Sequence, residues 1–219
     1  MALTEQDSCR PLRADARRNR ERITRCAREV FAEQGLEASI AEITRRAGVG
    51  AGTFYRHFPD RDALITSVFE EKMDAYVTAA QDALADPDPW RGFCTYVEKV
   101  CAMQAEDRGF THVLTSGFPT AEAFEAKRAA AYTYLIQLIA RAKAAGRLRQ
   151  DFAHQDLLML LMANAGVVAV TTDTLPDAWR RPVAYMLQAF DAANTVELPP
   201  APKGAQLSAA MTRSCADDE

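Results

Sequence analysis

The stretch that most constrains the fold is residues 39–58, SIAEITRRAGVGAGTFYRHF. Two short segments with helical spacing of apolar residues flank Gly48-Val49-Gly50, and closely spaced glycines of this kind interrupt a helix. Pro59 ends the second segment, because proline cannot continue a helix interior. Two short helices joined by a tight glycine turn predict a helix-turn-helix, with its second helix over residues 51–57.

The residues around this stretch predict how the helix pair is held. Ser39 and Glu42 have the S-x-x-E spacing of a capping box, in which each side chain satisfies a backbone N–H of the other residue. A longer helix over residues 18–34, with one apolar stripe, precedes the pair, and Gly35 suits its C-terminal end. The residues expected to face inward are Ile23, Cys26, Ala27, Val30, Phe31, Ile40, Ile43, Ala47 and Phe54.

Charge is unevenly distributed along the chain. The formal net charge of the whole chain is −4, but residues 10–61 contain 12 Lys and Arg against 7 Asp and Glu. A basic N-terminal region followed by an acidic body indicates that a polyanion binds the first region only. A solvated charged helix is the alternative interpretation of the same charge.

The five cysteines, an odd number without a CxxC pair, are typical of a reduced cytosolic protein. We expect them to be small buried hydrophobic residues, with redox sensing as the alternative. The N-terminus lacks the apolar core of a signal peptide. The apolar run over residues 157–172 is short for a membrane span and contains Asn164 and Gly166. We therefore expect a buried helix there, and a cytoplasmic protein without a membrane partner.

The rest of the chain has helical spacing without strand alternation, which predicts an all-α fold. Asp60 is expected to cap a helix over residues 60–84 that connects two domains. We expect a flexible basic arm over residues 1–16, a helix-turn-helix domain over 17–62, a larger helical domain over 63–196 and a disordered tail over 197–219. Further helices are expected over residues 89–106, 120–145, 154–172 and 182–193, with an irregular segment or short helix over 108–119.

A set of residues at fixed spacing surrounds the predicted helix-turn-helix: Phe31, Gly35, Ile43, Ala47-Gly48-Val49, Gly52-Thr53, Tyr55, His57-Phe58 and Arg61-x-x-Leu64. In these residues the chain resembles the TetR family of bacterial transcriptional regulators, over about residues 20–69. Gly146-Arg147-Leu148-Arg149-x-Asp151 and Asp156-Leu157 give a weaker likeness to the ligand domains of some members. The family fold is an N-terminal three-helix DNA-binding domain followed by a larger helical ligand-binding and dimerisation domain.

The resemblance implies which residues contact a double-stranded DNA operator. Ala51, Gly52 and Thr53 match positions that lie against base edges. Tyr55 and His57 match positions that touch phosphates, and the position of Arg61 adds a charged phosphate contact. A helix of this kind fits the major groove, which is about 12 Å wide. The complete predicted set is Arg17, Arg18, Ser39, Arg45, Ala51, Gly52, Thr53, Tyr55, Arg56, His57 and Arg61.

The predicted reading face is chemically sparse. Ala51 and Gly52 offer no side-chain hydrogen bond, and neither does Ala41, at a position where some family members recognise guanine with arginine. Direct readout therefore depends on Thr53 and Tyr55, with Arg45 and Arg56 as further candidates. We expect specificity to rely on thymine methyl contacts, the arm and DNA shape. A helix-turn-helix that binds a protein is the alternative.

The resemblance also implies a ligand pocket between the fifth and eighth helices, whose filling moves the fourth helix and changes the spacing of the paired DNA-binding domains. The candidate lining residues are Phe93, Val97, Cys101, Phe110, His112, Phe118, Tyr132, Ile136, Met162 and Asn164. Taken singly, each also fits a plain core position. Since buried polar groups need partners, His112 and Asn164 predict a small, mostly apolar effector with one or two hydrogen-bonding groups.

The two most apolar predicted helices, residues 154–172 and 182–193, predict a homodimer. Small residues such as Ala163 and Gly166 permit the close packing of a two-fold symmetric four-helix interface. Two copies would then bind half-sites about 34–36 Å apart on a palindromic operator. The predicted interface residues are Leu158, Met162, Gly166, Ala169, Tyr185 and Ala189. A buried helix pair within a monomer is the alternative.

Catalytic and metal-binding patterns are missing from the sequence. The three histidines lack metal-ligand spacing, and GxSxG, P-loop and Rossmann glycine motifs do not occur. We therefore expect no enzyme activity, no cofactor and no metal, and a dimeric DNA-binding regulator, a repressor that a small ligand releases. An activator, a helical enzyme using His112 with an acidic partner, and a helical protein-interaction module remain as alternatives.

Overall fold

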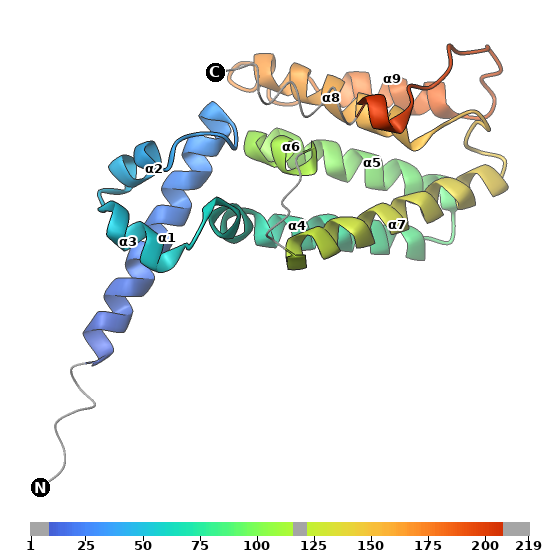
Figure 1. The fold of residues 1–219 in the computed structure, drawn as a ribbon. Helices are drawn as coiled ribbons and strands as arrows, with labels where there is room; N and C mark the ends of the chain where they lie inside the picture. Colours follow the sequence, from blue (N-terminus) through green and yellow to red (C-terminus); the bar gives the residue numbers. More distant parts are fainter. Residues whose placement is uncertain (1–8, 116–121, 208–219) are drawn as a thin grey trace, which may run out of the picture. The chain divides into compact units, whose positions relative to one another are not determined.

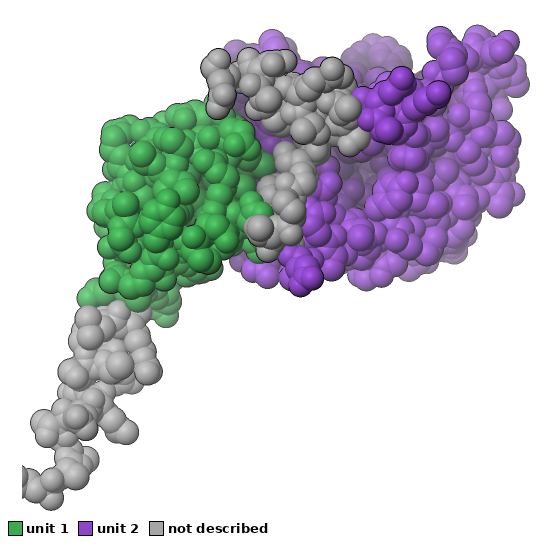
Figure 2. All heavy atoms as spheres, viewed as in Figure 1, with its two compact units in different colours: residues 1–68 green, residues 69–219 purple. Residues whose placement is uncertain are grey.

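The computed structural model describes residues 9–115 and 122–207 of the chain. These residues form helices and no strand, which confirms the all-α prediction (Figure 1). The chain divides into two compact units, Met1–Val68 and Phe69–Glu219 (Figure 2). Helix α4 (Arg61–Ala85) contributes residues to both units, much as the helix expected over residues 60–84 was to connect two domains.

The first unit contains α1 (Cys9–Gln34), α2 (Ile40–Ala47), α3 (Ala51–His57) and the beginning of α4. Helix α1 packs against α2, and α2 against α3. The predicted inward-facing residues form the core of this unit, except that Ile40 is only half-buried. Fully buried aromatic side chains fill its centre, namely Phe31, Phe54 and Phe58.

Helix α1 begins earlier than the sequence predicted. We expected an irregular arm through residue 16, but residues 9–16 are helical. Pro11 lies in the first turn, where the N–H that proline lacks would have no partner within the helix. Of the predicted arm, residues 1–8 lie outside the described residues.

The second unit is built around α5 (Pro89–Glu106). Helix α5 packs against α6 (Arg108–Thr115), α7 (Glu122–Ala144), α8 (His154–Thr171) and α9 (Arg180–Phe190). Its apolar residues, which lie on most sides of the helix, account for this central position. The Asp88 side chain caps α5 by accepting hydrogen bonds from the backbone N–H groups of Trp90 and Arg91.

Two helices of the second unit have bounds that the sequence did not predict. The segment expected to be irregular or a short helix forms α6, and residues 116–121 after it lie outside the described residues. Helix α9 begins at Arg180 rather than at Pro182, because proline is tolerated in the first turn of a helix. It ends at Phe190, before Asp191 pairs with Leu148 in an isolated antiparallel bridge.

The chain has a defined structure just before and within the first part of the predicted disordered tail, residues 197–219. The buried guanidinium of Arg149 donates from Nη2 to the backbone carbonyl of Val196 at 2.8 Å. A turn of helix follows over residues 204–207. Residues 208–219 lie outside the described residues.

Helix α8 was expected to be buried, but one side of it is exposed. Leu157, Leu160 and Val168 lie in the core, whereas Val170 is 84% exposed. The helix is long and apolar enough to cross a membrane, but core helices of soluble proteins meet the same criterion. In this fold 28% of the helix is buried. The exposed side is considered below with the predicted dimer interface.

Candidate nucleic-acid interface

Local hydrogen bonds position α2 and α3. Ser39 is the N-cap of α2, and its Oγ accepts a hydrogen bond from the Glu42 backbone N–H at 3.1 Å. Gly48 ends α2 in the left-handed conformation, with φ of 61°, which a residue with a side chain rarely adopts. Its N–H donates to the Arg45 carbonyl at 3.2 Å. These contacts explain why the chain turns between the two helices at this point.

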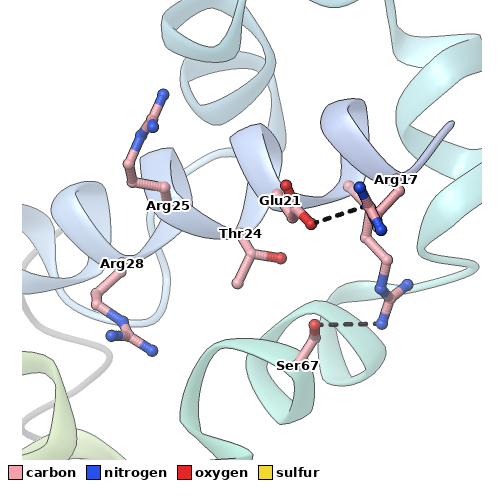
Figure 3. A pocket seen from close by; sticks show the side chains of 7 residues that line it. Arg17, Glu21, Thr24, Arg25, Arg28 and Ser67 are labelled. Carbon is pink, nitrogen blue, oxygen red and sulfur yellow. Dashed lines mark hydrogen bonds and ion pairs between the residues drawn. The ribbon is translucent and has the colours of Figure 1, made fainter. Parts of the chain in front are cut away.

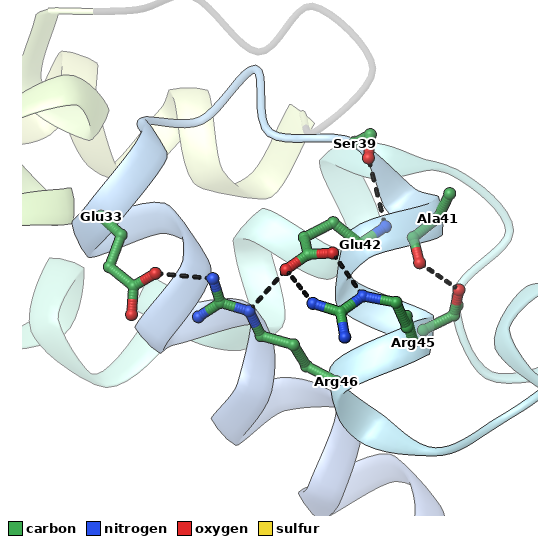
Figure 4. A network of polar contacts seen from close by, with 7 residues as sticks. Glu33, Ser39, Ala41, Glu42, Arg45 and Arg46 are labelled. Carbon is green, nitrogen blue, oxygen red and sulfur yellow. Dashed lines mark hydrogen bonds and ion pairs between the residues drawn. The ribbon is translucent and has the colours of Figure 1, made fainter.

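Only half of the predicted capping box is present. The Glu42 carboxylate was expected to accept from the Ser39 backbone, but it accepts from two guanidinium groups instead (Figure 4). Arg45 binds it through Nε and Nη2, both at 2.8 Å, and Arg46 through Nε at 2.7 Å. Arg46 also reaches Glu33 of α1 at 2.7 Å. Two cations attract this carboxylate more strongly than one amide, and Arg46 thereby ties α2 to α1.

These ion pairs change the charge that α2 presents. Hydrogen bonds from Arg45 and then Arg46 lower the pKa of Glu42 to about 2, so it stays ionised. Most of the Arg45 side chain remains exposed. Arg45 therefore lies where the sequence placed it, on the surface, but its charge is partly compensated by Glu42.

Helix α3 has one buried and one exposed side. Phe54 is fully buried and Phe58 packs against it, while Tyr55 is 53% exposed. Ala51, Gly52 and Arg56 are exposed, and Thr53 is half-buried. The predicted reading face is therefore brought together on one accessible surface, and it is as poor in hydrogen-bonding side chains as expected. A Cβ added at Gly52 would meet no atom within 4 Å, so packing does not require glycine there.

Arg56 is the cation of α3 that the structure leaves available. Within the described residues its guanidinium has no hydrogen-bond or ion-pair partner, unlike that of Arg45. An exposed, uncompensated guanidinium suits either a phosphate or the edge of guanine.

His57 is not placed as a positively charged side chain that would bind a phosphate. Its side chain is half-buried, and Nε2 is buried without a hydrogen-bond partner among the described residues. Burial, and then the charges of Arg56 and Arg20, lower its pKa from the ordinary 6.5. A neutral imidazole is thus favoured, which could donate a hydrogen bond but contributes no positive charge.

Arg61 has a structural role in addition to the predicted phosphate contact. Its Nη1 donates to the backbone carbonyls of Leu36 at 2.5 Å and Ala38 at 2.9 Å. Both acceptors lie in the loop between α1 and α2, so Arg61 fixes that loop to the start of α4. Since Nη1 is used within the unit, a phosphate contact by Arg61 would have to come from its other N–H donors, and the phosphate assignment stays a prediction.

The remaining predicted DNA contacts are Arg17, Arg18 and Ser39. Both arginines are exposed on α1 and form ion pairs, Arg17 with Glu21 at 3.5 Å and Arg18 with Asp15. Exposed pairs of this kind are weak, so they leave both side chains free to exchange partners. Ser39 Oγ accepts a hydrogen bond in the helix cap, which leaves the O–H of this exposed residue to donate.

The candidate effector residues do not gather in one place. Phe93, Val97, Cys101 and Phe110 are fully buried core residues. Four others are exposed, and Phe118 lies outside the described residues; the exposed ones are His112, Tyr132, Ile136 and Met162. The expectation of a buried polar His112 is therefore wrong, because its position on α6 faces solvent.

Asn164 was correctly expected to be buried and in need of partners. Its Nδ2 donates to Gln104 Oε1 at 2.9 Å and to the Cys101 carbonyl at 3.2 Å, which links α8 to α5. Its Oδ1 is buried without a hydrogen-bond partner among the described residues, and the hydroxyl of Tyr96 on α5 is buried near that of Tyr76. Gln104 and Tyr96 were not among the predicted residues. Their positions on the apolar helix α5 were the available signal, since a polar group there must be buried.

The exposed side of α8 and α9 is apolar. Met162 is 44% exposed, Tyr185 is 56% exposed, and Leu158 is half-buried. Gly166, Ala169 and Ala189 are exposed as well, and a Cβ at Gly166 would meet no atom within 4 Å. All six predicted interface residues are thus at least partly accessible. In the alternative, a helix pair buried within a monomer, these residues would be buried.

The structure argues against redox sensing at two cysteines. Burial, with a smaller contribution from Glu98, raises the pKa of both Cys94 and Cys101 to about 12. Thiols in this state are poor nucleophiles and oxidise slowly. No group of three or more His, Cys, Asp or Glu side chains in residues 9–115 and 122–207 is arranged to hold a metal ion.

The capped α2, the glycine turn and the exposed side of α3 define a helix-turn-helix DNA-binding regulator. Two family models match the chain: bacterial regulatory proteins of the tetR family over residues 23–68, and the C-terminal domain of SbtR-like transcriptional regulators over residues 88–188. A TetR transcription regulatory protein from Mycobacterium vanbaalenii is 37% identical, over 74% of this chain and 98% of that one, with a TM-score of 0.41. The chain belongs to the TetR family.

Two other proteins illustrate how the similarity is distributed. An HTH-type transcriptional regulator of Staphylococcus aureus (strain USA300) is 40% identical over 68 residues, 31% of this chain and 37% of that protein. The match thus spans little more than a third of the length of that relative. A tetR-family regulatory protein from Rhodococcus RHA1 is 18% identical over 78% of this chain and 96% of its own, with a TM-score of 0.60, and so shares the fold.

Proposed function

We propose that this TetR-family regulator is a homodimeric repressor that binds a palindromic operator through α3. The observation that carries the proposal is the two-sided α3, with Phe54 fully buried and Tyr55 and Arg56 exposed beside it. The exposed residues of α3 form a surface without a carboxylate, which suits the negatively charged groove. Base contacts then come from Thr53 and Tyr55, and phosphate contacts from Arg56 and the arginines of α1.

A mobility-shift titration tests the DNA-binding part. The probe is a duplex taken from the region upstream of the chain's own coding sequence, with a scrambled duplex of equal length as the control. We expect a complex with the first duplex alone at moderate salt, and affinity that falls steeply as salt rises. Equal affinity for both duplexes would contradict an operator-specific role.

The dimer is proposed to form through α8 and α9. Apolar side chains such as Met162, Tyr185 and Val170 are exposed there, and large accessible apolar surfaces mark interaction sites. Exposed small residues, among them Gly166, allow the helices of two copies to approach closely. Analytical ultracentrifugation of the purified chain tests this proposal, and a single species of monomer mass at micromolar concentration would contradict it.

The effector is proposed to be small and mostly apolar, with one or two hydrogen-bonding groups, and to bind beside α5. Asn164 Oδ1 supports this proposal, because it is a buried polar atom without a partner among the described residues, and Tyr96 places a second buried polar group on α5. Filling this region would displace α4 and change the spacing of the two reading helices. Release of the operator complex by hydrophobic phenols or amides, with no chemical change in the added compound, would test both the ligand class and the absence of catalysis.

A regulator that acts on chromosomal DNA works in the cytoplasm, and we propose that location for this chain. The free thiols of Cys94 and Cys101 agree with a reducing compartment. Fractionation of cells expressing a tagged full-length chain would test it, and recovery with the membrane after a salt wash would contradict it.

A further inference from the structure

A basic cleft lies within the first unit, between α1 and the beginning of α4 (Figure 3). Its volume is about 460 Å³, within the range of sites for small molecules. Its lining contains four cations and one acid: Arg17, Arg20, Glu21, Thr24, Arg25, Arg28 and Ser67.

Two of these arginines hydrogen-bond to adjacent residues of α4 although they are separated along α1. Arg20 and Arg28 are eight residues apart, which corresponds to about 12 Å along a helix axis. Nevertheless Arg20 Nη2 donates to Ser67 Oγ at 3.2 Å, and Arg28 Nη2 donates to the Val68 carbonyl at 2.7 Å. Since Ser67 and Val68 are adjacent residues of α4, both arginines of α1 are attached to the same turn of that helix.

Among the described residues, the guanidinium groups of Arg20 and Arg28 lack a counter-charge. The acceptors of Arg20 and Arg28 are neutral, namely a hydroxyl and backbone carbonyls. The acid of the cleft, Glu21, pairs with Arg17. Each guanidinium has five N–H donors and uses only one or two of them here. The cleft therefore combines uncompensated positive charge with guanidinium N–H groups that are not used in hydrogen bonds.

We propose that this cleft binds a phosphate-bearing small molecule. The planar guanidinium groups of Arg20 and Arg28 match phosphate oxygens in pairs, which favours phosphate over a monovalent anion. Thr24 lies between the two arginines on α1, and the hydroxyls of Thr24 and Ser67 add neutral donors. Arg20 Nη1 also donates to the His57 carbonyl at 2.9 Å, so the bound anion contacts a side chain that holds the end of α3.

The cleft shares Arg17 with the predicted DNA contacts and extends beyond them. Arg28 lies eleven residues beyond Arg17 on α1, about 16 Å farther along the helix. A DNA phosphate held by Arg17 does not reach that end. The test of anion binding does not depend on operator binding, because anion binding is measured on the protein without DNA.

Thermal unfolding of the full-length protein with inorganic pyrophosphate as the probe tests the proposal. Ionic strength is held constant with potassium chloride, and isothermal titration calorimetry gives the dissociation constant. A ligand that binds only the folded state raises the melting temperature as its concentration increases. We expect saturable binding and a rising melting temperature; the absence of saturable binding to the DNA-free protein would overturn the proposal, including the case in which the cleft serves only DNA.

A matched pair of variants separates the cleft from the general charge of α1. Thr24→Glu places a carboxylate between Arg20 and Arg28, four residues from each, and should replace the anion, raise the melting temperature and abolish the response to pyrophosphate. Asn19→Glu makes the same change of charge on α1 outside the cleft, and should leave the dissociation constant within about two-fold of wild type. An equal loss in both variants, or an undiminished response in Thr24→Glu, would overturn the proposal.

A third variant tests the geometry without changing the charge. Arg28→Lys keeps the cation but loses the planar pair of donors, and should weaken pyrophosphate binding roughly ten-fold. Binding equal to wild type in this variant would mean that phosphate is not held in the manner proposed.

Discussion

The helix-turn-helix and the region around α5 differ in how their functional residues are positioned. In α2 and α3 the decisive contacts are local, since Ser39 Oγ accepts from the N–H three residues later and Gly48 bonds back to Arg45. Around α5 they are distant, since Asn164 bonds to Cys101 and Gln104, 63 and 60 residues away. A surface site built by local spacing can thus be inferred from sequence, whereas an interior site depends on which helices pack together.

The largest effect is expected on the exposed side of α8. Gly166→Glu should prevent dimer formation, because the two carboxylates would meet near the symmetry axis without partners. Losing the second half-site should weaken operator binding roughly 100-fold or more. Sedimentation and a mobility shift measure both effects, with Ala140→Glu on an exposed position of α7 as the control. A stable dimer of Gly166→Glu would place the interface elsewhere.

The distant contacts around α5 can be tested by a double-mutant cycle. Asn164→Leu should lower the free energy of unfolding by about 1–3 kcal/mol, because Gln104 is left buried with an unpaired carbonyl. Adding Gln104→Leu should restore most of that loss, as both polar partners are then removed. Urea unfolding measures the two changes. Additive losses in the double variant would show that the pair is not coupled.

Arg61 and Arg56 separate a scaffold role from a DNA-contacting role within the first unit. Arg61→Ala removes two hydrogen bonds to the loop between α1 and α2 and should lower the free energy of unfolding by about 1–2 kcal/mol. Arg56→Ala removes no such bond and should leave stability unchanged while weakening DNA binding. Urea unfolding and fluorescence anisotropy distinguish the two arginines, and the reverse pattern would refute these assignments.

The smallest expected effect is the pH dependence of stability from His57. Because its pKa is lowered in the folded state, the unfolded chain binds more protons below about 6.5, and stability should fall as the pH decreases through that value. The melting temperature of wild type is compared with that of His57→Gln from about pH 7.5 to about pH 5.5. The variant should show the shallower dependence; identical slopes would assign the titration to other groups.

The sequence was sufficient for the fold and for the exposed side of α3. Helical spacing, Ser39, Gly48 and Pro59 determine where α2 and α3 begin and end, and the structure agrees within a residue or two. The sequence did not reveal which hydrogen-bond partner each polar side chain binds. Glu42 has arginines three and four residues away as well as the Ser39 amide, and only geometry decides among them.

The same limitation explains which contacts of single residues were not foreseen. Arg61 was assigned to DNA by its position after α3, yet backbone carbonyls 23 and 25 residues earlier accept its N–H groups. His112 was expected to be buried on apolar neighbours alone, but the packing of α6 turns it outward. Arg20 and Arg28 were overlooked because the residues of α4 that they bind are 47 and 40 residues away.

The exposed side of α3 as the DNA-binding surface is tested most directly by fluorescence anisotropy with the duplex from the chain's own upstream region. Thr53→Ala and Tyr55→Ala should each lower the free energy of operator binding by about 1–3 kcal/mol, with the dimer intact by sedimentation. Thr133→Ala, an exposed threonine of α7, is the matched control and should bind as wild type does. Unchanged affinity in both α3 variants would contradict the role assigned to this helix.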